Sequence, residues 1–171
     1  MVTGPAPFTG PTRLIEDRYI VGTQLRLRLV TVEGEAVRKL TQKVRPRPED
    51  PFEVAITTMY LEPKEYTCLL GLRAAVLRKT RRECHVEGIR FVIDEFHGDL
   101  SGLTLSEVEV QQREGALPRP AWLGREVSDD ERFTGGRLAS ASREEAAQLC
   151  DAQASEPLNS DAGNASPGQR R

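Results

Sequence analysis

The chain has 171 residues, of which 38% are hydrophobic, 29% charged and 5% aromatic, a length that suits one folded domain with loose ends. The formal net charge of −2 argues against a general nucleic-acid-binding protein, and the few aromatic residues leave little surface for stacking bases. We predict neither a signal peptide nor a membrane helix, because no basic flank precedes an apolar run and no stretch reaches ~20 apolar residues. The three cysteines follow no metal-ligand spacing and indicate a reduced, cytoplasmic protein.

Charge is distributed unevenly along the chain. Residues 13–47 contain nine Arg or Lys and four acids, whereas residues 91–131 contain ten acids and three Arg. If both segments fold into one unit, a cationic wall is expected opposite an anionic wall.

The composition predicts three regions. Residues 1–12 are rich in Pro, Gly and Thr and are expected to form a flexible lead-in. Residues 13–138 form the folded unit. Residues 139–171 turn to Ala, Ser, Gln and Glu, which predicts a short helix over Ser142–Ala152 and then a disordered tail.

Alternating apolar and polar residues predict strands over most of the folded unit. Glu33-Gly34 and Glu87-Gly88 are typical of tight turns. Strands are predicted over residues 13–21, 23–32, 36–44, 52–61, 74–86, 88–98 and 103–111.

One helix is predicted over residues 62–72, with Pro63 in its first turn and Gly71 near its end. Seven regularly spaced strands with one or two helices predict an α+β fold in which an antiparallel sheet forms a barrel.

Each long strand has one apolar and one charged face. Arg26 and Arg28 are two residues apart, so both guanidinium groups leave the same side of their strand, about 6.5–7 Å apart. Several fixed cations on one face suit a polyanion such as triphosphate, because Arg offers bidentate forks. The alternative is that Arg and Lys simply solvate the exposed faces of a sheet. Later strands repeat the pattern at Lys39 and Lys43 and at Lys79 and Arg81.

Acidic residues occur on the predicted strands near the end of the folded unit, and two of them are spaced two residues apart like most of the basic pairs. Glu107 and Glu109 share a strand face, and Asp94 lies two residues before Phe96. Two carboxylates on one face repel each other unless a cation lies between them, and a Mg²⁺ or Mn²⁺ ion with phosphate oxygens and water is such a cation. The alternative is an exposed E-x-E pair on an edge strand.

The order of these features is more specific than any one of them. It runs R-x-R, T-x-K, a helix, K-x-R, D-x-F, E-x-E and then "REVSDDERFTGG". This order resembles the CYTH, or triphosphate tunnel metalloenzyme, family over about residues 11–139. The resemblance implies an eight-stranded tunnel with charged side chains inside and helices outside. It also implies binding of inorganic triphosphate, nucleoside triphosphates or thiamine triphosphate with a divalent metal, followed in most members by hydrolysis and in some by cyclisation of ATP.

The resemblance also implies roles for individual residues. Phosphate oxygens would be held by basic residues, two acids would hold Mg²⁺ or Mn²⁺, and an acid and a lysine would take part in catalysis. The phosphate-binding residues are Arg26, Arg28, Lys39, Lys43, Arg81 and Arg132, the metal ligands Glu107 and Glu109, and the catalytic residues Asp94 and Lys79.

The chain departs from the family at its N-terminus, where the family has an E-x-E-x-K strand. Here the sequence begins "MVTGPAPFTGPTRLIEDRY". The first strand that resembles the family corresponds to the second strand of the family. Either half of the acidic cluster has been lost, or the coding start lies further upstream. The predicted fold is therefore a barrel that is incomplete by one N-terminal strand, which exposes a sheet edge.

Several functions fit these observations. We expect a metal-dependent triphosphate hydrolase whose activity is weakened by the missing strand. The alternatives are a non-catalytic polyphosphate or nucleotide sensor, an adenylate cyclase on the same scaffold, and an interaction protein whose charged faces are coincidental. The expected partner is a small triphosphate-type anion, with no nucleic acid and no membrane, and the sequence predicts no oligomeric state.

Overall fold

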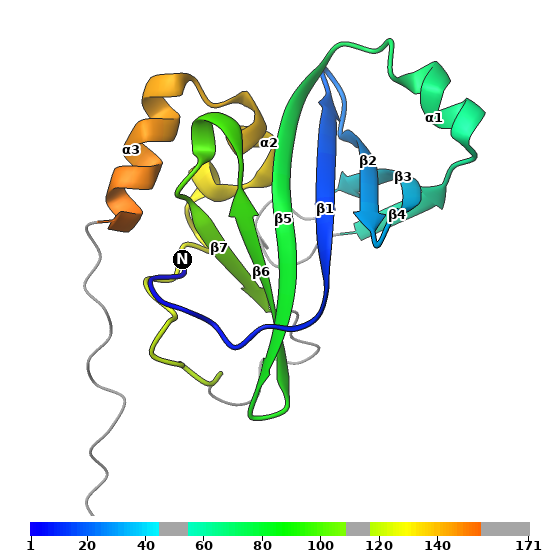
Figure 1. The fold of residues 1–171 in the computed structure, drawn as a ribbon. Coiled ribbons are helices and arrows are strands. Elements are labelled where there is room, and N and C mark those ends of the chain that lie inside the picture. The colour runs from blue at the N-terminus through cyan, green and yellow to red at the C-terminus, as the bar shows by residue number, and fades with distance from the viewer. Residues whose placement is uncertain (45–54, 109–116, 155–171) are drawn as a thin grey trace, which may run out of the picture.

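The described part of the chain forms one curled antiparallel sheet. The computed structural model describes residues 1–44, 55–108 and 117–154, and their seven strands have the order β4-β3-β2-β1-β5-β6-β7. Figure 1 shows β1 and β5 side by side at the centre, with β6 and β7 on one side and β2, β3 and β4 on the other. The strands are β1 (Thr9–Ile20), β2 (Leu25–Val32), β3 (Glu35–Val44), β4 (Ala55–Tyr60), β5 (Ala74–Val86), β6 (Ile89–Phe96) and β7 (Thr104–Val108).

Short helices flank this sheet. Helix α1 lies on the side of β2, β3 and β4, whereas α2 and α3 lie on the side of β6 and β7 (Figure 1). None of the helices in the described ranges combines the length and apolarity needed to cross a membrane. The prediction of an α+β fold with an incomplete antiparallel barrel and a few packing helices is confirmed, since the seven described strands form a curled half-barrel. The helices are α1 (Pro63–Leu69), α2 (Gly135–Ser140), α3 (Arg143–Ala154) and the 3₁₀ turns η1 (Gly98–Leu100) and η2 (Glu131–Phe133).

Two of the predicted turns have the backbone that a two-residue hairpin requires. The φ angles are 50° at Glu33 and 90° at Gly34, and 52° at Glu87 and 79° at Gly88. Positive φ at both central residues defines a type I′ turn, whose twist suits the right-handed twist of the flanking strands. The Glu-Gly pairs therefore fix where the β2–β3 and β5–β6 hairpins turn.

Helix α1 begins where the sequence predicts it. Pro63 occupies its first turn, where a missing amide hydrogen costs nothing. A capping box precedes it, in which the Glu62 amide donates to the Glu65 carboxylate at 2.7 Å. Tyr66 is the buried residue of the helix.

Apolar side chains form two clusters on opposite faces of the sheet. Phe91 and Phe96 of β6 lie an odd number of positions apart, so they point to opposite sides and belong to different clusters. Both faces of β5 and β6 are thereby covered. The first cluster contains Val2, Ala6, Cys84, Phe91, Ile93 and Trp122, and the second contains Met1, Leu77, Phe96, Leu100, Leu103, Leu105, Phe133, Leu138, Ala146 and Leu149.

The N-terminal segment packs against the rest of the chain, unlike the flexible lead-in expected for residues 1–12. Met1 and Val2 are buried, one in each apolar cluster. The Gln153 amide of α3 donates to the Val2 carbonyl at 2.7 Å, and β1 already begins at Thr9. Isolated apolar residues between Pro and Gly carry no periodicity, so the sequence pattern did not reveal this packing.

Helix α2 was not predicted, because its sequence opens with two glycines. Leu138 of this helix is buried in the second cluster, and α2 contacts both β1 and β5. Gly135 lies against the ring of Tyr19, so closely that a Cβ at this position would be 2.0 Å from the Tyr19 hydroxyl oxygen. The absence of a side chain at Gly135 therefore permits the close approach of α2 to the sheet.

Strand β4 is exposed over its whole length. It stands at one end of the strand order, so within the described residues only β3 pairs with it. Ile56, Met59 and Tyr60 are exposed, and Tyr60 is 72% accessible.

Gly135→Ala is expected to lower the melting temperature. The added Cβ would clash with the Tyr19 hydroxyl and lie 3.0 Å from its Cζ, and overpacking of this kind typically costs about 1–3 kcal/mol. In a domain of this size each kcal/mol lowers Tm by about 2–4 °C, which calorimetry measures. Gly71→Ala is the control, because no atom lies within 4 Å of a Cβ there. Equal melting temperatures for both variants would contradict the proposed close packing.

Candidate functional site

The charged residues predicted from the sequence that lie on described strands share one face of the sheet. Directly paired residues of antiparallel strands point to the same side, and Arg28 pairs with Lys39 on one side and with Asp17 on the other. Arg81 pairs with Asp94 in the same way. Alternation along the strands extends this side, which we call the charged face, to Arg26, Arg28, Lys39, Lys43, Lys79, Arg81, Asp17, Asp94 and Glu107.

The charged face is the concave side of the curled sheet. Lys43 of β3 and Glu107 of β7 are separated by five strand-to-strand steps, which in a flat sheet would amount to roughly 24 Å. Their charges nevertheless interact, together with those of Arg26, Arg28 and Lys79, although such interactions fade beyond a Debye length of about 10 Å. The sheet therefore curls until side chains from four strands converge.

Positive charge is in excess around Lys43. Burial of its ammonium group lowers the pKa of Lys43 below the usual 10.5, and Arg26 lowers it further, while Glu107 opposes the change. Solvent still reaches the side chain as a whole. The charged form of a lysine that is both desolvated and close to other cations would be stabilised by a bound anion.

Asp94 joins the two cations of β5. Its carboxylate is 1% exposed and accepts hydrogen bonds from Lys79 Nζ at 2.5 Å and from Arg81 Nε and Nη2, each at 2.7 Å. Burial raises the pKa of Asp94, but Arg81 and Lys79 outweigh this and hold it below the usual 3.8. Both oxygens of an ionised Asp94 are thus engaged by protein donors.

A second buried carboxylate, Asp17 on β1, was not singled out from the sequence. It is 0% exposed and accepts hydrogen bonds from Arg28 Nε at 2.5 Å and Arg28 Nη2 at 2.6 Å. Arg26 Nε lies 3.6 Å away. Alternation along β1 puts Asp17 on the same side as the buried Ile15, and this was the signal that could have found it.

Arg26 carries a donor that the described part of the chain does not satisfy. Its Nε is buried, and no acceptor among the described residues lies within hydrogen-bond distance. Buried donors of this kind are rare in folded proteins, and on the charged face an anion oxygen is a suitable acceptor.

Glu107 lies at the accessible margin of the charged face. Its side chain is 64% exposed and lies 3.3 Å from Arg81 Nη2, whereas Glu109 falls outside the described residues. Over the ranges that the structure describes, no group of three His, Cys, Asp or Glu residues is arranged to hold a metal ion. Lys39 is also on the charged face, with its ammonium 4.9 Å from the centre of the Tyr60 ring.

Arg132 does not join this arrangement. It lies in η2, and its Nε and Nη2 donate to the Asp130 carboxylate at 2.9 and 2.6 Å. Its side chain is 66% exposed. A phosphate-binding role for Arg132 remains a prediction from the resemblance.

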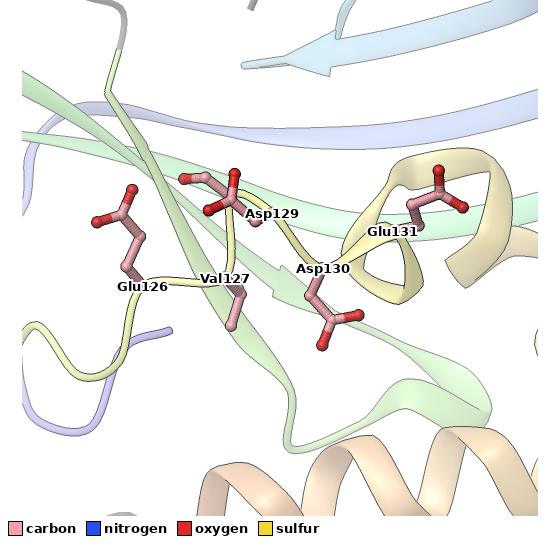
Figure 2. Close-up of a pocket in the computed structure, with 6 residues that line it drawn as sticks. Glu126, Val127, Asp129, Asp130 and Glu131 are labelled. Carbon is pink, nitrogen blue, oxygen red and sulfur yellow. The ribbon is translucent and has the colours of Figure 1, made fainter. Parts of the chain in front are cut away.

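A separate acidic pocket lies in the loop before α2. Figure 2 shows that the carboxylates of Glu126, Asp129, Asp130 and Glu131 point in different directions rather than toward one point. Because Arg132 already binds Asp130, the loop does not present the convergent oxygens that a divalent cation requires. The charged face, not this pocket, is the candidate site.

Solved structures share this architecture. The chain superposes on two structures, described as the inorganic triphosphatase NE1496 and as the hypothetical protein NE1496, each with a TM-score of 0.57 and 23% identity. The match covers 82% of this chain and 94% or 93% of the other. The fold is therefore that of a triphosphate tunnel protein.

A sequence relative identifies the family. No protein-family profile matches the chain, but it is 30% identical over 114 residues to an inorganic triphosphatase of Acetivibrio thermocellus. The alignment covers 67% of this chain and 70% of the relative. The chain belongs to the CYTH, or triphosphate tunnel metalloenzyme, family.

Asp94→Asn is expected to destabilise the fold by about 3–5 kcal/mol, because it removes the carboxylate that pairs with the buried Lys79 and with Arg81. Folding lowers the pKa of Asp94, so its carboxylate stabilises the wild type above about pH 3.8 and this contribution is lost as the pH falls through the lowered pKa. Asp94→Asn should lack that acid-dependent loss. Urea unfolding from about pH 2 to pH 7 measures both effects.

Asp130→Asn is the control, since it removes a carboxylate paired with the exposed Arg132 and should change stability little. A pH profile of Asp94→Asn that parallels the wild type would contradict the assigned charge of Asp94.

Proposed function

We propose that the chain binds triphosphate-type anions on the charged face and hydrolyses them with the help of a divalent cation. One observation carries the proposal: cations of β2, β3 and β5 converge on a concave face, where burial and, after it, the neighbouring Arg26 lower the pKa of Lys43. The name of the A. thermocellus relative, inorganic triphosphatase, supports triphosphate as the anion.

Three side chains are proposed to hold the phosphate oxygens. Arg26 offers a buried Nε without an acceptor among the described residues, and Lys43 offers an ammonium whose charge an anion would stabilise. Arg28 uses Nε and Nη2 to bind Asp17, which leaves Nη1 for a ligand. Charge-assisted hydrogen bonds of this kind are about twice as strong as neutral ones.

The acidic residues of the described charged face suit a metal site in which phosphate oxygens of the substrate supply some of the ligands. Asp17 and Asp94 are engaged by Arg and Lys side chains, whereas the Glu107 side chain is accessible. Mg²⁺ is commonly bound by one or two carboxylates, with phosphate oxygens and water completing its shell. We therefore assign Mg²⁺ or Mn²⁺ to Glu107, with Glu109 as a second predicted ligand outside the described residues.

Hydrolysis of a phosphoanhydride depends on charge neutralisation more than on covalent chemistry by the protein. A bound metal ion would polarise the phosphate oxygens. Water attacks the terminal phosphorus and the bridging P–O bond breaks, so that negative charge develops on the leaving phosphate. Lys79 and Arg81, which Asp94 holds in place, are proposed to absorb that charge.

Anion binding without turnover is the second candidate function. It is favoured by the engagement of both Asp94 oxygens with Lys79 and Arg81, because this carboxylate is then not free to bind a metal ion. The two candidates differ in phosphate release and agree in binding.

Tripolyphosphate is expected to bind more tightly than orthophosphate, and more weakly as salt rises, because Coulomb terms dominate. Lys43→Met should weaken tripolyphosphate binding by about 10–100-fold, the equivalent of one charge-assisted hydrogen bond. Wild-type affinity should also fall as the pH rises through the lowered pKa of Lys43, because the neutral amine no longer attracts the anion. Titration calorimetry measures all three.

Lys64→Met serves as the control. It also removes one positive charge, but from the exposed surface of α1, which is not part of the charged face. Equal affinities for the two anions, or equal losses in the two Lys variants, would exclude the charged face as the binding site.

Glu107→Gln is expected to lower metal-dependent phosphate release from tripolyphosphate by about 10²–10³-fold, as loss of one charge-stabilising group does elsewhere. Phosphate release is followed with Mg²⁺, with Mn²⁺ and with a chelator. Glu95→Gln is the control, because Glu95 pairs with Arg82 on the opposite face of the sheet. Chelator-sensitive turnover that survives Glu107→Gln would place the metal elsewhere, and no turnover in the wild type would favour the binding function.

A further inference from the structure

The charged face contains two buried carboxylates, and they are arranged alike. Asp94 accepts both Nε and Nη2 of an arginine on the neighbouring strand, and so does Asp17. Each also forms an ion pair with a second cation, two residues from that arginine. The cation pairs are Lys79 and Arg81 for Asp94, and Arg26 and Arg28 for Asp17.

Asp17 is held rigidly. It lies in the middle of β1, which is hydrogen-bonded to β2 on one side and to β5 on the other. Its side chain is 0% exposed, so it does not reach a ligand in solution. What it contacts is the guanidinium of Arg28, through the two donors that lie along one edge of the fork.

This contact restricts Arg28 to one orientation. An arginine side chain has many rotamers, and ordering it on binding a ligand costs conformational entropy. Because Asp17 already binds Nε and Nη2 of the planar guanidinium, the position of the remaining nitrogen, Nη1, is fixed as well. The cost of ordering is met during folding rather than during binding.

We propose that Asp17 is a positioning residue that acts through Arg28 to hold the anion site in its binding geometry. The inference rests on the proposed function, since it assumes that Arg28 contacts a phosphate oxygen. It adds a residue outside the set implied by the resemblance, and one that does not itself touch the ligand.

Removing the Asp17 carboxylate should raise the affinity for tripolyphosphate if only charge matters, and lower it if Asp17 positions Arg28. Asp17→Asn makes the charged face more positive by one unit, so Coulomb attraction alone predicts tighter binding of tripolyphosphate. Loss of the bidentate partner frees Arg28, so positioning predicts weaker binding. Groups that orient a metal ligand typically contribute about 10–100-fold to affinity, and we expect a loss of the same order for a group that orients Arg28.

The test compares Asp17→Asn with Glu16→Gln by titrating tripolyphosphate into each. Glu16 is the neighbouring residue on β1 and points to the opposite face, where it pairs with Arg78 at 2.9 Å. The Glu16→Gln substitution therefore removes one negative charge from the same strand without affecting the contact between Asp17 and Arg28. Asp17→Asn should bind at least about tenfold more weakly and Glu16→Gln like the wild type. Binding by Asp17→Asn that equals or exceeds that of the wild type would overturn the proposal.

A second variant separates positioning from general damage to the fold. Arg28→Lys keeps the charge and loses the fork that Asp17 holds. If Asp17 acts through Arg28, Asp17→Asn should weaken binding much less in the Arg28→Lys background than in the wild type, which a double-mutant cycle measures. Additive losses would show that Asp17 acts by another route and would overturn the proposal.

Arg28→Lys also carries the test alone if Asp17→Asn does not fold. It should then lose at least about tenfold in affinity despite its unchanged charge, and affinity equal to the wild type overturns the proposal. A wild-type chain that binds no tripolyphosphate would instead refute the proposed function, so the two failures are distinguishable.

Discussion

Like charges gathered on the concave side of a sheet repel one another, and curling the sheet brings them closer. The counter-charge has to lie among them, since the surrounding apolar side chains offer no hydrogen bonds. Asp17 on β1 and Asp94 on β6 supply it from both sides of the central β5, and each holds a guanidinium by two donors. The same contacts stabilise the curl and order the arginines, so folding and the preparation of the site are one event.

The apolar clusters explain why a sheet with a charged face is stable. One cluster covers the convex side of β5–β7 around Phe91 and Trp122, whose rings meet edge to face at 5.3 Å. The other covers part of the charged side itself, where Leu77 and Phe96 pack against the C-terminal helices. Ion pairs next to this cluster are poorly screened. A small anion would meet fixed charges in a setting where each is stronger than in water.

The strands, the Glu-Gly hairpins and α1 were predictable because each depends on a local sequence signal. These signals are alternation for the strands, glycine at the turns, and Pro63 in the first turn of the helix. Alternation also sorted the charged residues onto one face. The packing of Met1 and Val2, and the helix beginning at Gly135, depend on contacts between distant segments, and no local pattern carries that information. Alternation could place Asp17 on the same side of its strand as Ile15, but its partner Arg28 becomes evident only from the strand register.

The exposed strand β4 has a consequence for the protein in concentrated solution. Its six residues, AITTMY, contain no charge and no proline, and β-branched and aromatic side chains of this kind favour extended structure. Within the described part of the chain its outer backbone groups meet no further strand, which makes the edge a template for strands of other molecules. A single lysine in β4 would put a charge on this edge, which is how natural sheets guard exposed edge strands.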